Sequence, residues 1–369
     1  MSDIPSPKLH PEVAINQHLV PQCYMRQWSY NRNKSVWIFD KNAKLDGEKT
    51  DWRIESKKIE KINAKNNFYD IKAGSMYMPY EAAEEIFGPV EGFRFTYNGF
   101  HLDSPEKLNQ YYEVFDKWEI FDSDGNVVEG SKRDRLKEYF ASSRYTYIET
   151  AWNRCYENDW RRFITKVENN VRGAVVGNSP PGITQEDLAL VIKYAIIFDW
   201  RCTGKTEIID DAVRALFSIA PEIFDGIVPG NKEENEENTT FGEIIYRTLW
   251  VKWFYEYLKN DSGVLKQCLN EYLKNISVKF CLTDSTYPFI TSDVPSFISK
   301  RDDGYVEHVF VARPTLLVVL GRGETSECYA SRLSHDEVNK YNRSIAEHGN
   351  LLILPQNTFP ISDLFEEAN

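Results

Sequence analysis

The sequence predicts an α+β fold, in which strands from both ends of the chain form a mixed sheet around a central, largely helical segment. Short runs with alternating apolar side chains, typical of strands, occur at residues 35–41 and recur across residues 276–369, together with one helix. Residues 132–275 instead hold apolar side chains at the three- and four-residue spacing of helices. We therefore expect the 369 residues to form a single α+β domain whose two ends pair in one sheet.

Composition limits the class of protein. A hydrophobic content of 42%, with 9 Trp, 21 Tyr and 21 Phe, is ample for a packed core. The formal net charge of −12 argues against a generally basic nucleic-acid-binding surface, but it leaves room for a local basic cleft. The 6 cysteines include no CxxC pair, so neither a zinc site nor a disulfide framework is expected. No run resembles a signal peptide or a membrane span, and we expect a cytoplasmic, soluble protein that does not contact a membrane.

The N-terminal third alternates short elements with turns. Residues 1–16 carry three prolines and are expected to form an extended arm. A turn at Asn31–Asn33 precedes the strand at 35–41, and residues 52–71 end in a second short strand. Residues 79–130 are mixed and aromatic. Their DSDG sequence, at 122–125, lacks the glycine and glutamate spacing of a calcium loop and predicts a hairpin turn.

The centre of the chain is predicted to be helical. Residues 132–171 have no internal proline or glycine, and Thr184 begins a second helix with a capping residue, Asp187, three positions later. That helix is apolar almost all round, so we expect it to be the buried central helix. An acidic run at 229–240 predicts a solvated loop, and two further helices follow at 241–260 and 264–275.

The C-terminal part returns to strands. Apolar alternation predicts strands at 276–284, 288–293, 305–312, 315–321 and 351–355. A capped helix is expected between the last two strands, at 334–349.

One N-terminal stretch, QHLVPQCYMRQW at 17–28, gathers polar groups that could form a site. His18, Gln22 and Arg26 are four residues apart, which on a helix places them on one face. Pro21 is tolerated only in a first helical turn, so we expect a helix that begins near Val20 with His18 in the turn before it. An imidazole, an amide and a guanidinium placed together predict a binding or catalytic site.

A second candidate stretch is PFITSDVPSFIS, at 288–299. A strand runs into Ser292 and Asp293 and then into a turn, which is a common way to present a catalytic carboxylate. The alternative is an Asx-type turn, in which Asp293 caps nearby backbone. Both interpretations stay open, and the first would require His18 and Asp293 to share one cleft.

Other residues extend or limit this site. Arg26 and Arg201 could be ion-pair partners of Asp199 or Asp293, or they could bind phosphate. The GKT at 204–206 lacks the upstream glycine of a phosphate-binding loop, and neither HExxH nor GxSxG occurs. Nucleotide hydrolysis by a P-loop and zinc proteolysis are therefore not expected, and no metal or other cofactor is expected.

Three segments, HLVPQCYMRQW, VWIFDK and ITSDVP, resemble in order and spacing the bacterial family called domain of unknown function 4238. The positions that match the family's pattern are His18, Pro21, Gln22, Arg26, Asp40, Arg201, Thr291, Ser292, Asp293, Pro295 and Asn342. Residues 79–130 match nothing in that pattern, and FDWRCTG departs from it, which leaves Asp199 without support from the family. The resemblance implies no settled activity, and it implies a loose association with antiviral defence.

The leading hypothesis is a metal-independent N-glycosidase that removes a base from nucleic acid, most simply DNA, in defence against phage. Such a reaction needs a carboxylate that stabilises a cationic sugar or orients water, together with groups that recognise the extruded base. We assign the residues as follows: Asp293 and Ser292 with His18 to catalysis, Gln22 with His18 to the base, Arg26 and Arg201 to phosphates, and Trp28 and Trp200 to base stacking.

Two alternatives stay open. One is a nuclease with His18 as general base, and the other is a non-catalytic sensor whose pocket holds a nucleotide. Because the chain is acidic, binding to nucleic acid requires a local basic surface around Arg26 and Arg201, extended by Lys132–Arg135 or by Arg161 and Arg162. The oligomeric state is not predicted.

Overall fold

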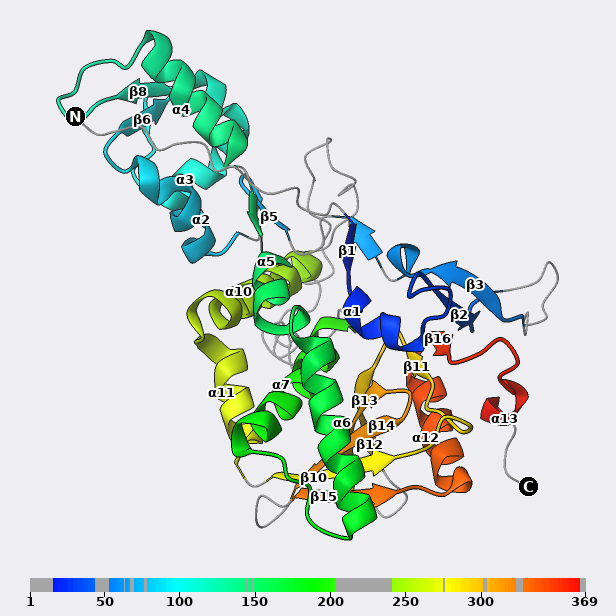
Figure 1. Cartoon of the computed structure of the whole chain (residues 1–369). Coiled ribbons are helices and arrows are strands. Elements are labelled where there is room, and N and C mark those ends of the chain that lie inside the picture. The colour runs from blue at the N-terminus through cyan, green and yellow to red at the C-terminus, as the bar shows by residue number, and fades with distance from the viewer. Residues whose placement is uncertain are drawn as a thin grey trace. The chain divides into compact units, whose positions relative to one another are not determined.

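A computed structural model of the chain describes residues 16–43, 53–62, 64–66, 70–75, 78–143, 145–147, 149–202, 241–274, 276–300, 304–322 and 328–365 (Figure 1). Residues 1–15 of the expected arm and the acidic run at 229–240 lie outside these ranges. The helices and strands combine mixed and antiparallel sheets, so the predicted α+β class is confirmed.

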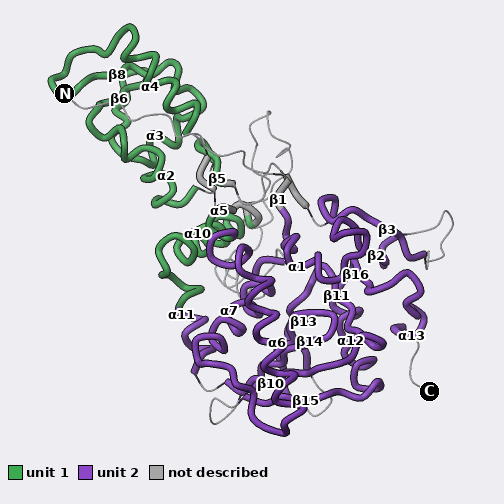
Figure 2. The backbone as a smooth tube through the Cα atoms, in the orientation of Figure 1, with its two compact units in different colours: residues 1–15, 67–152, 207–266 green, residues 16–66, 153–206, 267–369 purple. Residues whose placement is uncertain are grey.

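The chain divides into two compact units, each built from three separate segments (Figure 2). Unit 1 comprises residues 1–15, 67–152 and 207–266, and unit 2 comprises residues 16–66, 153–206 and 267–369. We predicted a single domain, and this division was not anticipated. Every candidate site residue belongs to unit 2.

Unit 2 contains two main sheets. The larger is five-stranded, in the order β12-β13-β14-β10-β15, and the smaller is four-stranded, in the order β11-β16-β2-β3. The strands of the larger sheet are β10 (Ile276–Leu282), β12 (Ser296–Lys300), β13 (Val306–Arg313), β14 (Leu316–Arg322) and β15 (Cys328–Arg332). Those of the smaller sheet are β2 (Ser35–Asp40), β3 (Glu55–Lys58), β11 (Thr291–Ser292) and β16 (Leu351–Leu354). A short ladder joins β1 (Asn16–His18) to β4 (Ala64–Asn66).

The smaller sheet confirms that the two ends of the chain pair. In the antiparallel ladder of β2 and β16, Trp37 lies opposite Leu354 and Phe39 lies opposite Leu352. Phe39 and Leu352 are fully buried, and Ile38 and Ile353, which point to the opposite face, are buried as well, so both faces of this strand pair are covered.

Unit 2 contains five described helices. They are α1 (Gln22–Met25), α6 (Trp160–Gly177), α7 (Gln185–Cys202), α12 (His335–His348) and α13 (Ser362–Phe365), with 3-10 turns η1 (Arg26–Trp28) and η2 (Ile59–Lys61). Within α11 (Gly263–Tyr272) the chain passes from unit 1 to unit 2.

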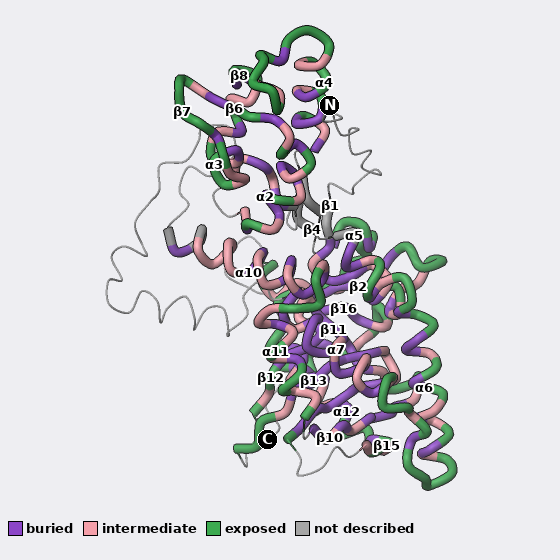
Figure 3. Tube along the Cα trace, turned by 90° about the vertical axis from the view of Figure 1, so that its left-hand side faces the viewer, coloured by how far each residue is buried: buried purple, intermediate pink, exposed green. Residues whose placement is uncertain are grey.

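Two helices lie on one face of the larger sheet and α12 lies on the other. Phe198 of α7 packs on Phe310 of β13, with ring centroids 5.3 Å apart. On β12, Phe297 points to the opposite face and stacks on His348 of α12 at 4.1 Å. As expected, α7 is buried along most of its length and is capped by Thr184, which accepts a hydrogen bond from Asp187 N at 3.2 Å (Figure 3).

Unit 1 has its own aromatic core. Its described elements are β5 (Asp70–Lys72), α2 (Tyr80–Phe87), η3 (Gly88–Val90), β6 (Arg94–Tyr97), β7 (Phe100–His101), α3 (Pro105–Gln110), η4 (Tyr112–Lys117), β8 (Glu119–Phe121), α4 (Gly130–Ser142), β9 (Tyr145–Tyr147), α5 (Glu149–Trp152) and α10 (Phe241–Asn260). Trp118 and Phe140 meet edge to face at 5.3 Å, the arrangement that aromatic rings prefer. The DSDG sequence forms a turn closed by Gly125 N donating to Asp122 O, as predicted.

Two differences from the predicted elements bear on the site. Residues 132–171 are not one helical run, because β9 and a π-helical turn, η5 (Asn153–Glu157), interrupt them. Strands β12 and β15 were missed, since their short sequences carry little apolar alternation. None of the described helices is long and apolar enough to cross a membrane.

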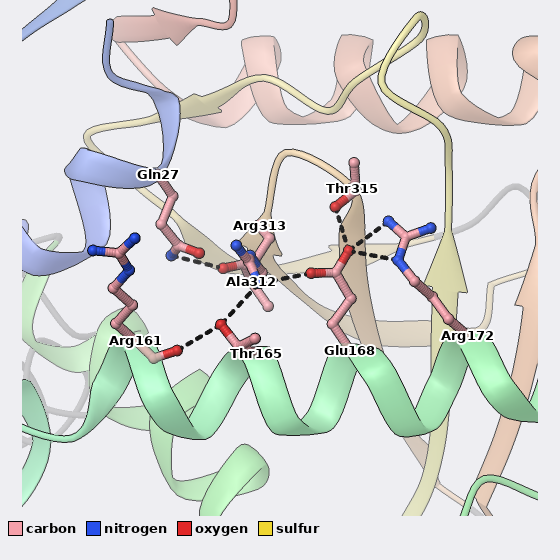
Figure 4. A network of polar contacts seen from close by, with 8 residues as sticks. All are labelled: Gln27, Arg161, Thr165, Glu168, Arg172, Ala312, Arg313 and Thr315. Carbon is pink, nitrogen blue, oxygen red and sulfur yellow. Dashed lines mark hydrogen bonds and ion pairs between the residues drawn. The ribbon is translucent and has the colours of Figure 1, made fainter. Parts of the chain in front are cut away.

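A buried carboxylate fastens α6 to the connection between β13 and β14 (Figure 4). Glu168 Oε2 pairs with Arg313 at 2.7 Å, while Oε1 accepts hydrogen bonds from Arg172 and from Thr315, both at 2.5 Å. Arg313 also donates to Thr165 Oγ1 at 3.1 Å. A buried charge is tolerated only when it is paired in this way, so the network holds α6 in place.

Candidate functional site

His18 ends β1 and is held through one ring nitrogen by the chain after η2. Its Nδ1 lies 3.0 Å from the carbonyl oxygen of Ile62. Because a carbonyl can only accept, Nδ1 carries the proton and Nε2 presents its lone pair. The imidazole is therefore held in one tautomer, with Nε2 directed toward α1.

A hydrogen-bonded chain leads from that lone pair to the surface. Gln22 Nε2 donates to His18 Nε2 at 2.8 Å, and Gln22 Oε1 accepts from Arg26 at 3.2 Å. Pro21 precedes the first turn of α1, where its missing N–H costs nothing, and the four-residue spacing then brings the three side chains together. The predicted grouping of His18, Gln22 and Arg26 is confirmed.

Burial keeps this imidazole uncharged. Removal from water lowers the pKa of His18, and the positive charges of Arg201 and Arg26 lower it further. The hydrogen bond to Ile62 and the negative charge of Glu157 act in the opposite direction. At neutral pH, His18 is therefore an acceptor of protons or hydrogen bonds at Nε2.

Arg201, at the end of α7, is 2% exposed and is engaged by the chain itself. Its guanidinium donates to Glu157 Oε1 at 2.5 Å and to the backbone carbonyl of His18 at 2.8 Å. Glu157 is thus an ion-pair partner of Arg201, a carboxylate that we had not considered beside Asp199 and Asp293. A phosphate could bind Arg201 only by displacing Glu157, so the geometry favours a positioning role over the predicted phosphate contact.

Glu157 was not predicted. It ends η5, the π-helical turn before α6, and its side chain is 15% exposed. The sequence NRCYENDW contains no glycine or proline, so a π-helical turn there looks like ordinary helix. A carboxylate next to the His18 backbone carbonyl was therefore hidden within an expected helix.

Asp293 and Ser292 hold a turn to the start of β16. Ser292 Oγ bonds the amide and the carbonyl of Val294, both at 3.0 Å. Asp293 Oδ1 accepts from the backbone amides of Asn350 at 2.9 Å and Leu351 at 3.1 Å. Burial raises the pKa of Asp293, while these amides and Lys41 oppose the rise. Asp293 thus caps backbone through one oxygen, but this backbone is remote in sequence and is not the nearby backbone of the Asx-type alternative.

A thiol connects this turn electrostatically to the His18 region. Cys202 Sγ donates to the carbonyl of Leu19, the neighbour of His18, at 3.2 Å. Burial chiefly raises the pKa of Cys202, Arg201 lowers it, and the charges of Asp199 and Asp293 raise it further. Asp293 therefore lies near enough to act on a group that contacts the His18 segment. That His18 and Asp293 share one cleft stays a prediction.

Other positions of the family pattern hold the framework. The hydroxyl of Tyr24 in α1 contacts Thr291 Oγ1 and donates to the carbonyl of Val311, both at 2.6 Å. Asn342 Oδ1 accepts from Ile290 N at 3.0 Å, so α12 is tied to the strand before Asp293. These buried polar side chains are satisfied and fix the backbone on which the candidate site stands.

The two tryptophans do not form a stacking platform. Trp28 is 2% exposed and donates its indole N–H to the carbonyl of Phe289 at 2.9 Å. Trp200 is 3% exposed. Our assignment of both rings to base stacking is corrected, because neither has an uncovered face.

A second polar cluster was missed in the sequence. His308 Nε2 lies 2.9 Å from Ser296 Oγ and 4.0 Å from Asp199 Oδ2. Both groups meet the same ring nitrogen, whereas a Ser-His-Asp triad needs them on opposite nitrogens. With Ser296 fully buried, this cluster has the geometry of a core contact.

Charge and metal-binding capacity limit the chemistry further. Two groups of residues were expected to extend a basic surface. Arg161 and Arg162 are exposed on α6 in unit 2, and Arg162 pairs with Asp159 at 2.9 Å. Residues 132–135 belong to α4 of unit 1. In the described ranges, no group of three or more His, Cys, Asp or Glu side chains could hold a metal ion.

Comparison with known proteins gives a family and nothing more specific. No curated protein and no solved structure matches the chain. A family model described as "protein of unknown function (DUF4238)" matches residues 16–357, which is most of the chain and includes every candidate site residue. The chain therefore belongs to the DUF4238 family.

Proposed function

We propose that this protein is an N-glycosidase that removes a base from nucleic acid, DNA in the first instance, in defence against phage. The observation that carries the proposal is the chain from Arg26 through Gln22 to His18. It joins an exposed cation, suited to a phosphate, to a half-buried amide and a buried imidazole, suited to a base.

The parts of the reaction divide among these groups. Arg26 binds a backbone phosphate at the surface. Gln22 turns its amide from His18 to the edge of the extruded base, and His18 Nε2, uncharged at neutral pH, then accepts a hydrogen bond from that base. Asp293 keeps one carboxylate oxygen clear of the two backbone amides, and this oxygen orients the attacking water.

A nuclease is the second candidate, and one observation favours it. The tautomer held by Ile62 leaves the lone pair of His18 on Nε2, as a general base requires. Base release and strand cleavage give different products, so one experiment separates the two reactions.

The test is to incubate the purified full chain with phage DNA, host DNA and RNA, with and without EDTA. Free bases are measured by mass spectrometry, abasic sites with an aldehyde-reactive probe, and strand breaks on denaturing gels. The proposal expects free base and abasic sites without direct breaks, and a loss of both in His18→Asn and Asp293→Asn.

Matched variants separate chemistry from binding and folding. Arg26→Ala should weaken substrate binding, whereas Arg162→Ala, which removes another exposed arginine, should not. Breaks without free base would favour the nuclease, and binding without any product would favour a sensor. Melting of the Asn variants several degrees below wild type would instead make these residues structural.

A further inference from the structure

We infer that Glu157 is the carboxylate that faces the reacting sugar carbon, in the same site as His18 and Gln22. This inference rests on the proposed function. Glu157 was not among the residues predicted from the sequence. Asp293 keeps the role of orienting the attacking water.

The geometry ties Glu157 to the His18 segment through one buried guanidinium. Arg201 reaches Glu157 Oε1 at 2.5 Å and the His18 carbonyl at 2.8 Å. A planar guanidinium that bonds both groups fixes the distance between the η5 turn and the end of β1. Movement of the carboxylate away from the imidazole would break a charge-assisted hydrogen bond at a buried arginine.

Only part of the carboxylate is used by this contact. Oε1 accepts the bond from Arg201, and no other described residue bonds Glu157. Its side chain is 15% exposed, so the second oxygen is not sealed in the core. A carboxylate that pairs with a buried cation through one oxygen, with no described residue on the other, suits stabilisation of a developing positive charge.

Glycosidic hydrolysis creates that charge. The bond from C1′ to the base nitrogen breaks, and its electron pair leaves with the nitrogen. Water then adds its oxygen to the cationic C1′, one water proton passes to the base nitrogen, and the other stays on the new hydroxyl. Glu157 stabilises C1′ between these events and is unchanged at the end, as expected for electrostatic catalysis.

Comparison with Asp293 favours Glu157 for this role. Asp293 Oδ1 is committed to two backbone amides that hold the start of β16. The charge of Glu157, by contrast, acts directly on His18, whose pKa it raises. The π-helical turn that carries Glu157 is a conformation that occurs frequently at functional sites.

The experiment uses two oligonucleotide probes that differ only in charge at the sugar. One carries a pyrrolidine abasic site, which is cationic and mimics the charged sugar, and the other carries a neutral tetrahydrofuran site. Affinity for both is measured by fluorescence anisotropy for wild type, Glu157→Gln and Asp293→Asn. Wild type should prefer the cationic probe by roughly tenfold or more, as expected for a hydrogen-bonded charge pair. Glu157→Gln should bind both probes equally, and Asp293→Asn should keep the preference.

Each other outcome is informative. If Asp293→Asn loses the preference and Glu157→Gln keeps it, the inference is wrong while the proposed function stands. The same conclusion follows if wild type binds both probes equally but releases base. If wild type binds neither probe and releases no base, the proposed function fails, and the inference fails with it.

Folding is checked by thermal melts of each variant. The glutamine amide oxygen can still accept from Arg201, so Glu157→Gln should fold. If Glu157→Gln unfolds, the Glu157→Asp variant is measured in its place. Its shorter side chain keeps the negative charge but moves it away from the sugar by the length of one methylene group. A preference unchanged in Glu157→Asp would then overturn the inference.

Discussion

The buried imidazole of His308 should make the protein less stable in mild acid. The side chain is 5% exposed, its Nδ1 has no hydrogen-bond partner in the described structure, and burial lowers its pKa from 6.5 to about 4. Between these two values the unfolded chain holds a proton that the folded chain does not. The free energy of unfolding therefore has its full value, as far as His308 is concerned, above pH 6.5, and it falls as the pH drops toward 4.

The size of the loss follows from the same values. Each pH unit between the folded and unfolded pKa corresponds to about 1.4 kcal/mol, so the interval from 6.5 to about 4 corresponds to about 3 kcal/mol. At pH 5 the loss should be about 2 kcal/mol. Water does not reduce this loss by screening, since the ring is buried. Asp199, 4.0 Å from Nε2, could offset part of the loss if it approached the charged ring.

Urea unfolding between pH 7.5 and pH 5, followed by tryptophan fluorescence, measures this slope. In His308→Gln the amide can reach Ser296 and does not titrate, so about 2 kcal/mol of the pH dependence should disappear. His18 adds to the slope in the same direction in both proteins, because burial lowers its pKa as well. Equal slopes for wild type and His308→Gln would refute the reasoning.

Three further outcomes are expected. Gln22→Ala should raise the pKa of His18, because the lost amide stabilises the neutral ring, and a histidine NMR titration measures this shift. Glu168→Gln should lower the free energy of unfolding by about 3 kcal/mol, since two arginines lose their buried counter-charge. Gly349→Ala should cost about 1–3 kcal/mol, because the added methyl group would overlap Ser292, whereas Gly173→Ala, where nothing lies within 4 Å, should cost nothing.

Each of these expectations can be contradicted separately. A His18 pKa that is unchanged or falls in Gln22→Ala would mean that the amide does not stabilise the neutral ring. A loss below about 0.5 kcal/mol in Glu168→Gln, the size seen for exposed pairs, would mean that the network in Figure 4 is screened by water. Equal melting temperatures for the two glycine variants would show that the loop at Gly349 yields freely.

Sequence reasoning succeeded where local rules decide the structure. Pro21 and the four-residue spacing sufficed to group His18 with Gln22 and Arg26, since both act within a short stretch of chain around the start of α1. That strands from both ends of the chain share a sheet also followed from the pattern, because apolar strands need partners; β2 and β16 form that pair.

Long-range geometry could not be predicted in the same way. Nothing local to Glu157 indicates that the chain brings it to Arg201, which lies 44 positions away. The tryptophans were misassigned because sequence alone does not separate a buried ring from a stacking ring. Likewise, neither open interpretation of Asp293 had it accept amides 57 and 58 positions later, because that contact depends on the tertiary fold.

The pairing of β2 between β3 and β16 has a consequence for synthesis of the chain. β3 follows β2 closely and can form a hairpin with it early, whereas β16 emerges only near the end of translation. At about 5–20 residues per second, the β16 edge of β2 stays open for roughly 15–60 s after it leaves the ribosome. During that interval, Val36, Ile38 and Phe39 belong to an unpaired apolar strand, which is a template for association with other nascent chains. Expression should therefore depend on chaperones that bind extended segments early in translation, well before the rest of unit 2 exists.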